Sequence, residues 1–289
     1  MNNISAGKLF KELRTKQNIS LKEAVKDIDK FSTSRLSHWE KDSSNIPLYK
    51  LDQLLYNIHV LPTEFAELLG LRFVNTVTLK VQDAFIANNI NELYRLASKQ
   101  LAKYNKIKDD NELYLSAVSC NFYFQKSQIN IFPTELKVRL TNSLENISLW
   151  NQYYITILGN AVNLVDSKQL FKIAKSLIKN MDHIKKSGLE SYIYATLALL
   201  NVNTKLLFDS PQLAKKLFVE IDKLEINQFD FYSSLYKKFI YHLISYKTNK
   251  TNIDLKLAQN LVDLTYHIDK PEAADELNDI LLQIQNSSK

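Results

Sequence analysis

Residues 32–38, Ser-Thr-Ser-Arg-Leu-Ser-His, gather short hydroxyls, a guanidinium and an imidazole in one stretch. Leu36 and Trp39 lie at helical spacing and predict the inward face of a short helix capped by Ser32. The outward side then carries a polar row: Thr33, Ser34, Ser37 and His38, with Arg35 at its edge. Hydroxyls can hydrogen-bond base edges or phosphates, and Arg can bind guanine or a phosphate. The row predicts contact with the major groove of double-stranded DNA, which admits one helix.

Five short helices are expected within residues 1–70, and they would position this polar row. Their signals are an apolar face in 7–17, a capping box at Ser20 and Glu23, a cap at Ser32, helical spacing in 47–58, and a cap at Thr63 before a stop at Gly70. The second helix is expected to bury Ala24, Val25 and Ile28. Two short helices joined by a tight turn can place the second in the groove, so residues 1–70 are predicted to form a helix-turn-helix DNA-binding domain.

Residues 71–289 show longer helical patterns in close succession. The chain has only 4 Gly and 5 Pro, and those that interrupt patterns stand at expected helix ends and starts. The predicted helices cover 71–88, 91–105, 110–126, 134–147, 149–164, 167–186, 189–208, 211–224, 230–247, 252–268 and 271–285. Helices of this length joined by short loops predict hairpins stacked in a right-handed, tetratricopeptide-like superhelix. The fold class is therefore expected to be all-α, with a repeat domain over 71–289.

Charge and composition constrain the function without deciding it. The net charge is +6, but residues 1–70 hold 10 basic and 9 acidic residues, so bulk charge alone does not indicate DNA binding. Residues 1–41 hold 9 basic and 5 acidic residues, which places the excess beside the polar row. The start has no apolar leader and no long apolar run follows, so a cytoplasmic protein without a membrane partner is expected.

Enzyme chemistry finds no support in the sequence. Phosphate-binding glycine motifs and zinc-binding histidine motifs are missing, the five His are scattered, and the one cysteine, Cys120, lies in an apolar stretch. We expect no catalytic residues, no metal and no cofactor.

The segment 14–58 resembles the helix-turn-helix of the phage-repressor-like (Xre) family. The shared features are Arg14, "SLKEAV", "STSRLSHWE" and "PLYKLDQLL". The resemblance implies that Arg14 pairs with Glu40 to orient the recognition helix, and that Thr33, Ser34 and His38 read bases. It also implies a phosphate contact near Ser20 or Leu21, where Leu21 could offer only its backbone amide.

Nearly the whole chain resembles the Rgg/MutR family of regulators. The resemblance rests on "FSTSRLSHWEKDSSNIPLYKLDQLLYNIHVLPTEF", on "LWNQYYITILGN", and on later segments in the family's order, such as "DFYSSLYKKFIYHLISYKTNK". It implies a cytoplasmic, homodimeric transcription regulator whose repeat domain binds a short hydrophobic pheromone peptide in a concave groove, as in quorum sensing. Some relatives lock the dimer with a cysteine that aligns with Leu48, so dimerisation is expected to come from repeat-domain packing that includes the C-terminal helices.

A peptide in such a groove needs partners for its backbone amides, and Asn offers both a donor and an acceptor. The family-like segments supply Asn and aromatic candidates: Asn160, Asn163, Asn201 and Asn203, with Tyr153, Tyr194 and Phe231 as apolar wall. Richness in Asn across the chain is an alternative explanation. Two alternative functions also stay open: a helical-repeat scaffold that binds a protein partner rather than DNA, and a repressor of the same architecture that binds no peptide.

Overall fold

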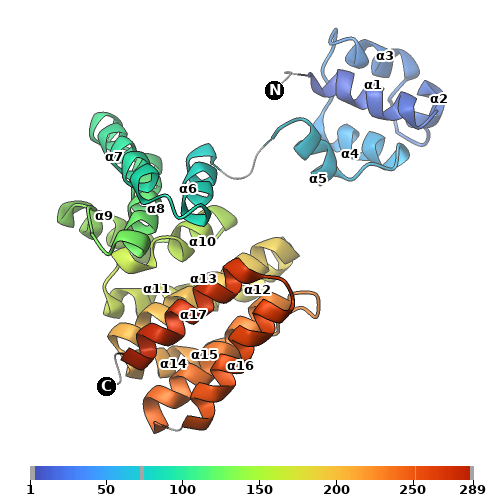
Figure 1. Ribbon diagram of the computed structural model, residues 1–289. Helices are drawn as coiled ribbons and strands as arrows, with labels where there is room; N and C mark the ends of the chain where they lie inside the picture. The colour runs from blue at the N-terminus through green and yellow to red at the C-terminus, as the bar shows by residue number, and fades with distance from the viewer. Residues whose placement is uncertain (1–3, 72–74, 251, 287–289) are drawn as a thin grey trace. The chain divides into compact units, whose positions relative to one another are not determined.

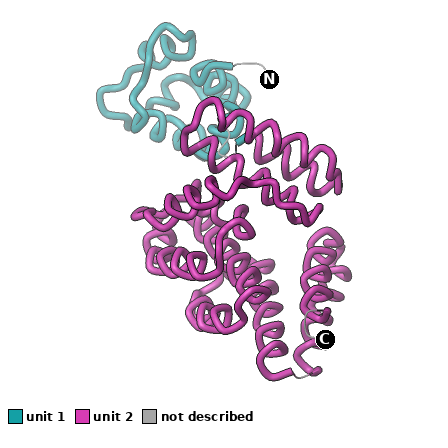
Figure 2. The backbone as a smooth tube through the Cα atoms, turned by 90° about the vertical axis from the view of Figure 1, so that its left-hand side faces the viewer, with its two compact units in different colours: residues 1–75 teal, residues 76–289 magenta. Residues whose placement is uncertain are grey.

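The computed structural model describes residues 4–71, 75–250 and 252–286, and all secondary structure in these ranges is helical. The expected all-α class is confirmed. The chain divides into two compact units, residues 1–75 and residues 76–289, drawn in separate colours in Figure 2. The division falls five residues beyond the expected boundary at 70.

Unit 1 contains five short helices around its own apolar core. They are α1 (Ala6–Lys16), α2 (Leu21–Ala24), α3 (Thr33–Glu40), α4 (Leu48–Asn57) and α5 (Pro62–Leu68). The largest fully buried side chains come from three of these helices and the residue after α4: Phe10, Leu36, Leu54, Leu55 and Ile58. Each helix is too short to be stable alone, so this shared core holds the five together.

The loop between α2 and α3 is longer than the sequence suggested. Val25 and Ile28 were expected within the second helix, but α2 ends at Ala24 and Val25 is its C-cap. Asp27 and Lys30 adopt left-handed backbone with φ of 60° and 50°, which ends the helix and turns the chain twice. The prediction for the extent of this helix was therefore wrong, although Ile28 still reaches the core.

Helix α5 begins one position before the predicted cap. Thr63 was expected to cap it, but Leu61 is the N-cap and Pro62 occupies the first turn. Pro is well suited there because its fixed φ fits a helix and its missing N–H has no intrahelical acceptor at that position.

Unit 2 is built from helical hairpins, seen from α6 to α17 in Figure 1. Its helices are α6 (Thr76–Ile86), α7 (Ile90–Ile107), α8 (Asp110–Ser127), α9 (Thr134–Glu145), α10 (Gln152–Gly159), the 3-10 turn η1 (Val162–Leu164), α11 (Ser167–Lys179), α12 (Met181–Ser187), α13 (Leu189–Asp209), α14 (Pro211–Ile221), α15 (Phe231–Asn249), α16 (Asn252–His267) and α17 (Pro271–Asn286). Residues 72–74 of the predicted helix 71–88 lie outside the described residues.

Two predicted helices of unit 2 are interrupted, both at Asn. The expected helix 149–164 is split into α10 and η1 around Asn160, the C-cap of α10. The expected helix 167–186 is split into α11 and α12 at Asn180, which ends one and begins the other. Asn competes with helical hydrogen bonding through its side chain, and both residues donate Nδ2 to a carbonyl four residues earlier.

Seven of the described helices of unit 2 form two rows. In one row α8, α10, α13 and α15 pack side by side, and in the other α9, α11 and α14 do so. Residues 112–123 of α8 are all buried, and α13 buries eleven residues along its length. These two central helices fix the position of α10, which packs closely on α13.

Candidate DNA-binding and peptide-binding surfaces

Helix α3 has one buried side and one exposed side, as its spacing predicts. Leu36, Trp39 and Glu40 face the core of unit 1. The opposite side carries the predicted DNA-contacting residues, of which Thr33, Ser34, Arg35 and His38 are exposed and Ser37 is half-buried. The exposed side is a continuous polar surface on a helix whose orientation is set by its other side.

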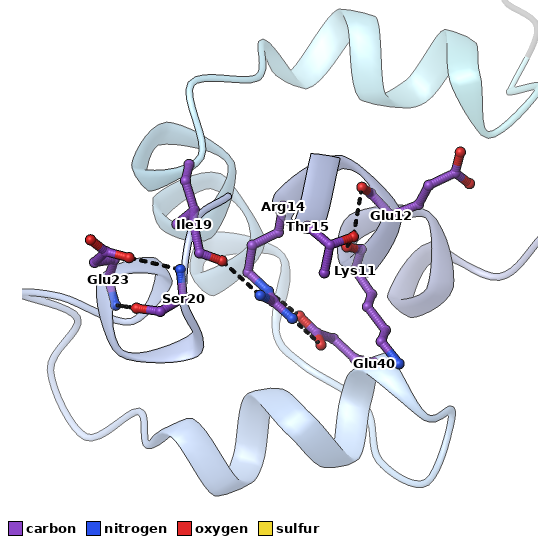
Figure 3. A network of polar contacts seen from close by, with 8 residues as sticks. All are labelled: Lys11, Glu12, Arg14, Thr15, Ile19, Ser20, Glu23 and Glu40. Atoms are coloured by element: carbon purple, nitrogen blue, oxygen red, sulfur yellow. Dashed lines mark hydrogen bonds and ion pairs between the residues drawn. The ribbon is translucent and has the colours of Figure 1, made fainter. Parts of the chain in front are cut away.

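A buried ion pair orients this helix, and Figure 3 shows its network. Arg14 Nε donates to Glu40 Oε1 at 2.7 Å and Nη2 donates to Oε2 at 2.8 Å, a two-bond fork between α1 and α3. Nη1 donates to the Ile19 carbonyl at 2.7 Å, which ties the fork to the chain entering α2. The side chains of the pair are only 8% and 4% exposed, so water screens the interaction little. The pair implied by the family resemblance is present.

Close packing of backbone and rings fixes α1 against α3. A Cβ added to Gly7 would lie 2.1 Å from the Trp39 carbonyl oxygen, so only glycine lets the two helices approach this far. The Phe10 and Trp39 rings pack with centroids 5.3 Å apart. The crossing of α1 and α3, and with it the direction of the polar row, is therefore set by packing as well as by charge.

Ser20 and Ser32 are both N-caps. Ser20 Oγ accepts from Glu23 N at 3.2 Å while Glu23 Oε2 accepts from Ser20 N at 2.7 Å, which completes the expected capping box. These hydrogen bonds from Ser20 lower the pKa of Glu23. Ser32 Oγ accepts from Arg35 N at 3.2 Å. Ser32 serves its cap as an acceptor only and so keeps its own proton for an external acceptor, whereas the Ser20 side chain also bonds the Glu23 carboxylate.

Two predicted DNA contacts are held in place by neighbours. The Arg35 guanidinium lies 5.4 Å from the centre of the Phe31 ring, a cation–π contact that supports the side chain beside the helix start. His38 Nδ1 lies 3.1 Å from Ser43 Oγ, which leaves its Nε2 free to face a ligand. Exposed lysines surround the polar row in sequence: Lys22, Lys26, Lys30 and Lys41.

Five of the predicted peptide-contacting residues lie along α10, η1 and α13; we call them the α10–α13 set: Tyr153, Asn160, Asn163, Tyr194 and Asn201. Tyr153 and Tyr194 are 41% and 40% exposed, and the three Asn are half-buried. Asn201 Nδ2 donates to the Gly159 carbonyl at 3.3 Å, and a Cβ on Gly159 would meet Ala198 Cβ at 3.3 Å. The missing side chain of Gly159 thus lets α10 and α13 approach and brings Asn160 beside Asn201.

Hydrogen bonding by the Asn residues leaves capacity for a ligand. Asn160 Nδ2 donates to the Thr156 carbonyl at 2.8 Å, so its Oδ1 stays available, as does that of Asn201. Asn163 donates its backbone N–H to Asn121 Oδ1 at 3.2 Å and uses its side chain for no hydrogen bond among the described residues. Free amide atoms beside partly exposed rings suit an extended peptide, which presents N–H and carbonyl groups between its side chains.

Asn203 does not belong with these residues. It is completely buried, and its Nδ2 donates to the Ala214 carbonyl at 2.9 Å, so it links α13 to α14 inside the core. Helical spacing places it on a different face of α13 from Asn201. We withdraw it from the candidate set. Phe231, which opens α15, is 56% exposed, and no hydrogen bond or ring contact among the described residues joins it to the α10–α13 set.

A family model described as "HTH-type transcriptional regulator Rgg, C-terminal domain" matches residues 94–279, well over half of the chain. The chain belongs to the Rgg family of transcriptional regulators. The match confirms the family resemblance seen in the sequence. Because the family consists of regulators, it also confirms the prediction that the chain is not an enzyme.

Solved structures share the fold over almost the entire chain. The Streptococcus dysgalactiae SHP pheromone receptor Rgg2 matches with a TM-score of 0.75 at 16% identity, covering 96% of this chain and 99% of that one. A putative transcriptional regulator from Listeria monocytogenes EGD-e matches with a TM-score of 0.77 at 14% identity, covering 99% of both chains. The PrgX/iCF10 complex gives 0.71 at 15%, covering 98% and 97%. At such identities the likeness concerns the fold.

Asn121 is a polar residue that sequence reasoning missed in this Rgg-family chain. It is fully buried on α8, its Oδ1 accepts from Asn163 N, and its Nδ2 has no hydrogen-bond partner within the described part of the chain. A buried donor without a partner costs roughly 1–3 kcal/mol. In the sequence it sits within "SCNFYF", where nothing separates it from the many other Asn. Its position next to the α10–α13 set makes it a further candidate for ligand contact.

Tyr153 belongs to an aromatic cluster that the sequence only hinted at. Its ring centroid lies 5.5 Å from that of Tyr154 and 6.0 Å from that of Tyr114, and its hydroxyl donates to Asn111 Oδ1 at 2.9 Å. Burial raises its pKa to about 12, so the hydroxyl stays protonated at neutral pH. Tyr153 is therefore a fixed, neutral aromatic wall.

Other expected features have clear positions. Leu48, where some relatives carry a cysteine, begins α4 and is 81% exposed. Within the described ranges no helix has the length and apolarity needed to cross a bilayer. The same ranges hold no cluster of three or more His, Cys, Asp or Glu arranged to bind a metal.

Proposed function

We propose that this Rgg-family chain is a cytoplasmic, homodimeric regulator that binds a DNA operator through α3 of unit 1. The observation that carries this proposal is the exposed polar side of α3, held by the buried Arg14–Glu40 fork. Thr33, Ser34, Ser37 and His38 would contact base edges, with Arg35 contacting a guanine or a phosphate. Ser32, at the start of α3, would donate to a phosphate, and Ser20 marks a second phosphate contact at the start of α2. Two such units in a two-fold dimer would read half-sites about one helical turn apart.

We further propose that unit 2 is the receptor for a short hydrophobic peptide of the pheromone type. Its support is the grouping of free amide atoms and partly exposed rings in the α10–α13 set, together with likeness to solved pheromone receptors. The Asn side chains would hydrogen-bond the peptide backbone, and Tyr153 and Tyr194 would contact its apolar side chains. Asn121 and Phe231 are further candidates for contact with the peptide.

DNA binding is tested by titrating the full chain onto promoter fragments from its own genomic neighbourhood at increasing salt. Phosphate contacts predict that log K falls linearly with log salt, with a slope of about −0.9 per phosphate neutralised. Arg35→Ala should lower specific binding by roughly 1–3 kcal/mol, whereas Lys106→Ala on α7 is the control. The role given to α3 would be refuted if both variants bound the promoter fragment and an unrelated fragment with equal strength.

Peptide binding is tested by heat unfolding with synthetic peptides encoded beside the gene. A ligand that binds only the folded state raises the midpoint as its concentration rises. Asn201→Ala should raise by about five-fold the peptide concentration needed for a given rise, since one hydrogen bond to a buried peptide group is worth about 1 kcal/mol. Asn105→Ala, an exposed Asn on α7, is the matched control. No saturable rise with any neighbouring peptide would refute the receptor half and leave the DNA-binding half standing.

A further inference from the structure

A groove runs along the surface of unit 2 between α14 and α15, which pack side by side (Figure 1). It consists of two hollows of about 490 Å³ and about 280 Å³ that share Phe218, Asp222 and Tyr241 and are therefore continuous. We call it the α14–α15 groove; its lining residues fall within 215–226 and 234–249. It includes no residue of α3 or of the α10–α13 set, so neither proposed binding activity accounts for it.

The centre of the groove is apolar. Phe218 of α14 is 7% exposed, and its ring centroid lies 6.1 Å from that of Tyr241 on α15. Tyr241 and Val219 are 46% and 55% exposed, so both helices present apolar surface to solvent here. Covering such surface with a partner is favourable, because it removes apolar area from water. The centre of the groove is therefore suited to receive apolar side chains.

The groove also carries positive charge. Four lysines and one carboxylate line it: Lys215, Lys223, Lys237, Lys238 and Asp222. Asp222 is occupied within the chain, because Lys237 Nζ lies 3.3 Å from its carboxylate and donates to its backbone carbonyl at 3.1 Å. Lys215 and Lys238 form no ion pair with any residue that the structure describes, and Lys238 Nζ lies 4.8 Å from the centre of the Tyr241 ring. One lysine from each helix is thus available to anionic groups of a partner.

The groove is long as well as narrow. Its lining residues on α15 run from Ser234 to Asn249, roughly 22 Å at 1.5 Å per residue. A small anion would occupy a fraction of that length. A partner helix of about four turns spans it, and an amphipathic helix presents apolar side chains to a groove at every third or fourth position.

Two other occupants fit the groove less well. Nucleic acid would place phosphates beside the lysines and leave the apolar centre without a matching surface. A second copy that met the groove with its own groove across a two-fold axis would bring Lys215 and Lys238 against the same lysines, which is unfavourable.

We propose that the α14–α15 groove is the docking site for an acidic amphipathic helix of a protein partner. The apolar side of that helix would contact Phe218, Val219 and Tyr241, and carboxylates on its two flanks would pair with Lys215 and Lys238. Contact between oppositely charged groups would steer the approach and fix the direction of the helix, and the apolar centre would supply most of the affinity. This is a third surface, and it depends on neither the operator nor the pheromone peptide.

Fluorescence anisotropy of the full chain with a designed probe tests the groove. The probe is a fluorescein-labelled helical peptide of about 18 residues, with Leu at positions i, i+3, i+4 and i+7 and Glu on both flanks. The control probe replaces every Glu by Lys. The acidic probe should bind saturably and at least ~10-fold more tightly than the basic probe. Equal binding of the two probes, or no saturable binding of the acidic one, would overturn the proposal.

Variants locate the binding on the groove. Lys215→Glu with Lys238→Glu should weaken the acidic probe by at least ~10-fold and strengthen the basic probe. Lys99→Glu with Lys106→Glu makes the same charge change at exposed residues of α7 and is the matched control. Val219→Ser should weaken the acidic probe by roughly five-fold, because two methyl groups no longer contact it. Circular dichroism checks that each variant keeps its helical content. An affinity that changes equally in the groove and α7 variants would contradict the assignment.

Two further readings of the same samples exclude the other occupants. A thymidine oligonucleotide with the same negative charge as the acidic probe should compete for the groove at least ~10-fold less well, and equal competition would overturn the choice of a helix. Sedimentation equilibrium should give the same molar mass for the wild type and the Lys215→Glu/Lys238→Glu variant. A change in mass would mean that a second copy covers the groove, and it would overturn the proposal.

Discussion

Replacing Glu40 by Leu should loosen unit 1 far more than removing an exposed ion pair does. The substitution keeps side-chain bulk but leaves the Arg14 guanidinium buried, 7% exposed, with only the Ile19 carbonyl as partner. Two charge-assisted hydrogen bonds of 2.7 and 2.8 Å are lost, and such bonds are worth about 1.5–3 kcal/mol each. Removing one partner of a buried ion pair costs about 3–5 kcal/mol of stability, because the other charge stays buried without a partner. We take about 3 kcal/mol as the expected loss in stability of unit 1.

Hydrogen exchange of the full chain, followed by mass spectrometry of segments, measures this loss. A loss of about 3 kcal/mol predicts that amides of α1 and α3 exchange about 100-fold faster, since every 1.4 kcal/mol is a factor of ten. Segments of unit 2 provide an internal reference, because the two units have separate cores.

Two further variants decide whether the buried charge is the cause. Arg14→Met combined with Glu40→Leu should recover most of the protection, because replacing both partners of a buried pair with apolar residues is often neutral. Glu12→Gln removes the exposed Lys16–Glu12 pair, whose side chains are 72% and 47% exposed, and should change exchange by less than about 1 kcal/mol. If Glu40→Leu exchanged no faster than Glu12→Gln, the ion pair would not be what holds α3, and our account of its orientation would be wrong.

Three more predictions concern the two cores. Gly7→Ala should lower the stability of unit 1 by about 1–3 kcal/mol or more in a urea titration, since its Cβ would lie 2.1 Å from the Trp39 carbonyl oxygen. Trp150→Leu should cost unit 2 about 2–4 kcal/mol in the same assay, because the ring is 1% exposed and its Nε1 donates to Ser176 Oγ. Burial raises the pKa of Cys120 from 9.0 to about 12. Above pH 9 an unfolded chain therefore loses a proton that the folded chain keeps, so the free energy of unfolding of unit 2 should fall with rising pH, and Cys120→Ala should flatten that fall.

Local signals in the sequence predicted most of unit 1 because its structure depends on local chemistry. The capping box at Ser20 and Glu23 involves residues three apart, and the spacing of Leu36 and Trp39 alone determines which side of α3 is buried. The α2–α3 loop was harder. Its course depends on Asn57 of α4, whose Nδ2 donates to the carbonyls of Ala24 and Lys26, and the sequence does not show that these segments meet.

Local signals in the sequence could not predict which of the peptide-binding candidates reach the surface. Asn201 and Asn203 are two residues apart and chemically identical, yet one is half-buried beside Gly159 and the other bonds Ala214 inside the core. Which one reaches a surface depends on how α13 is rotated between α10 and α14. That rotation follows from packing over the whole helix, including the close approach permitted by Gly159, so no pattern within α13 alone separates the two.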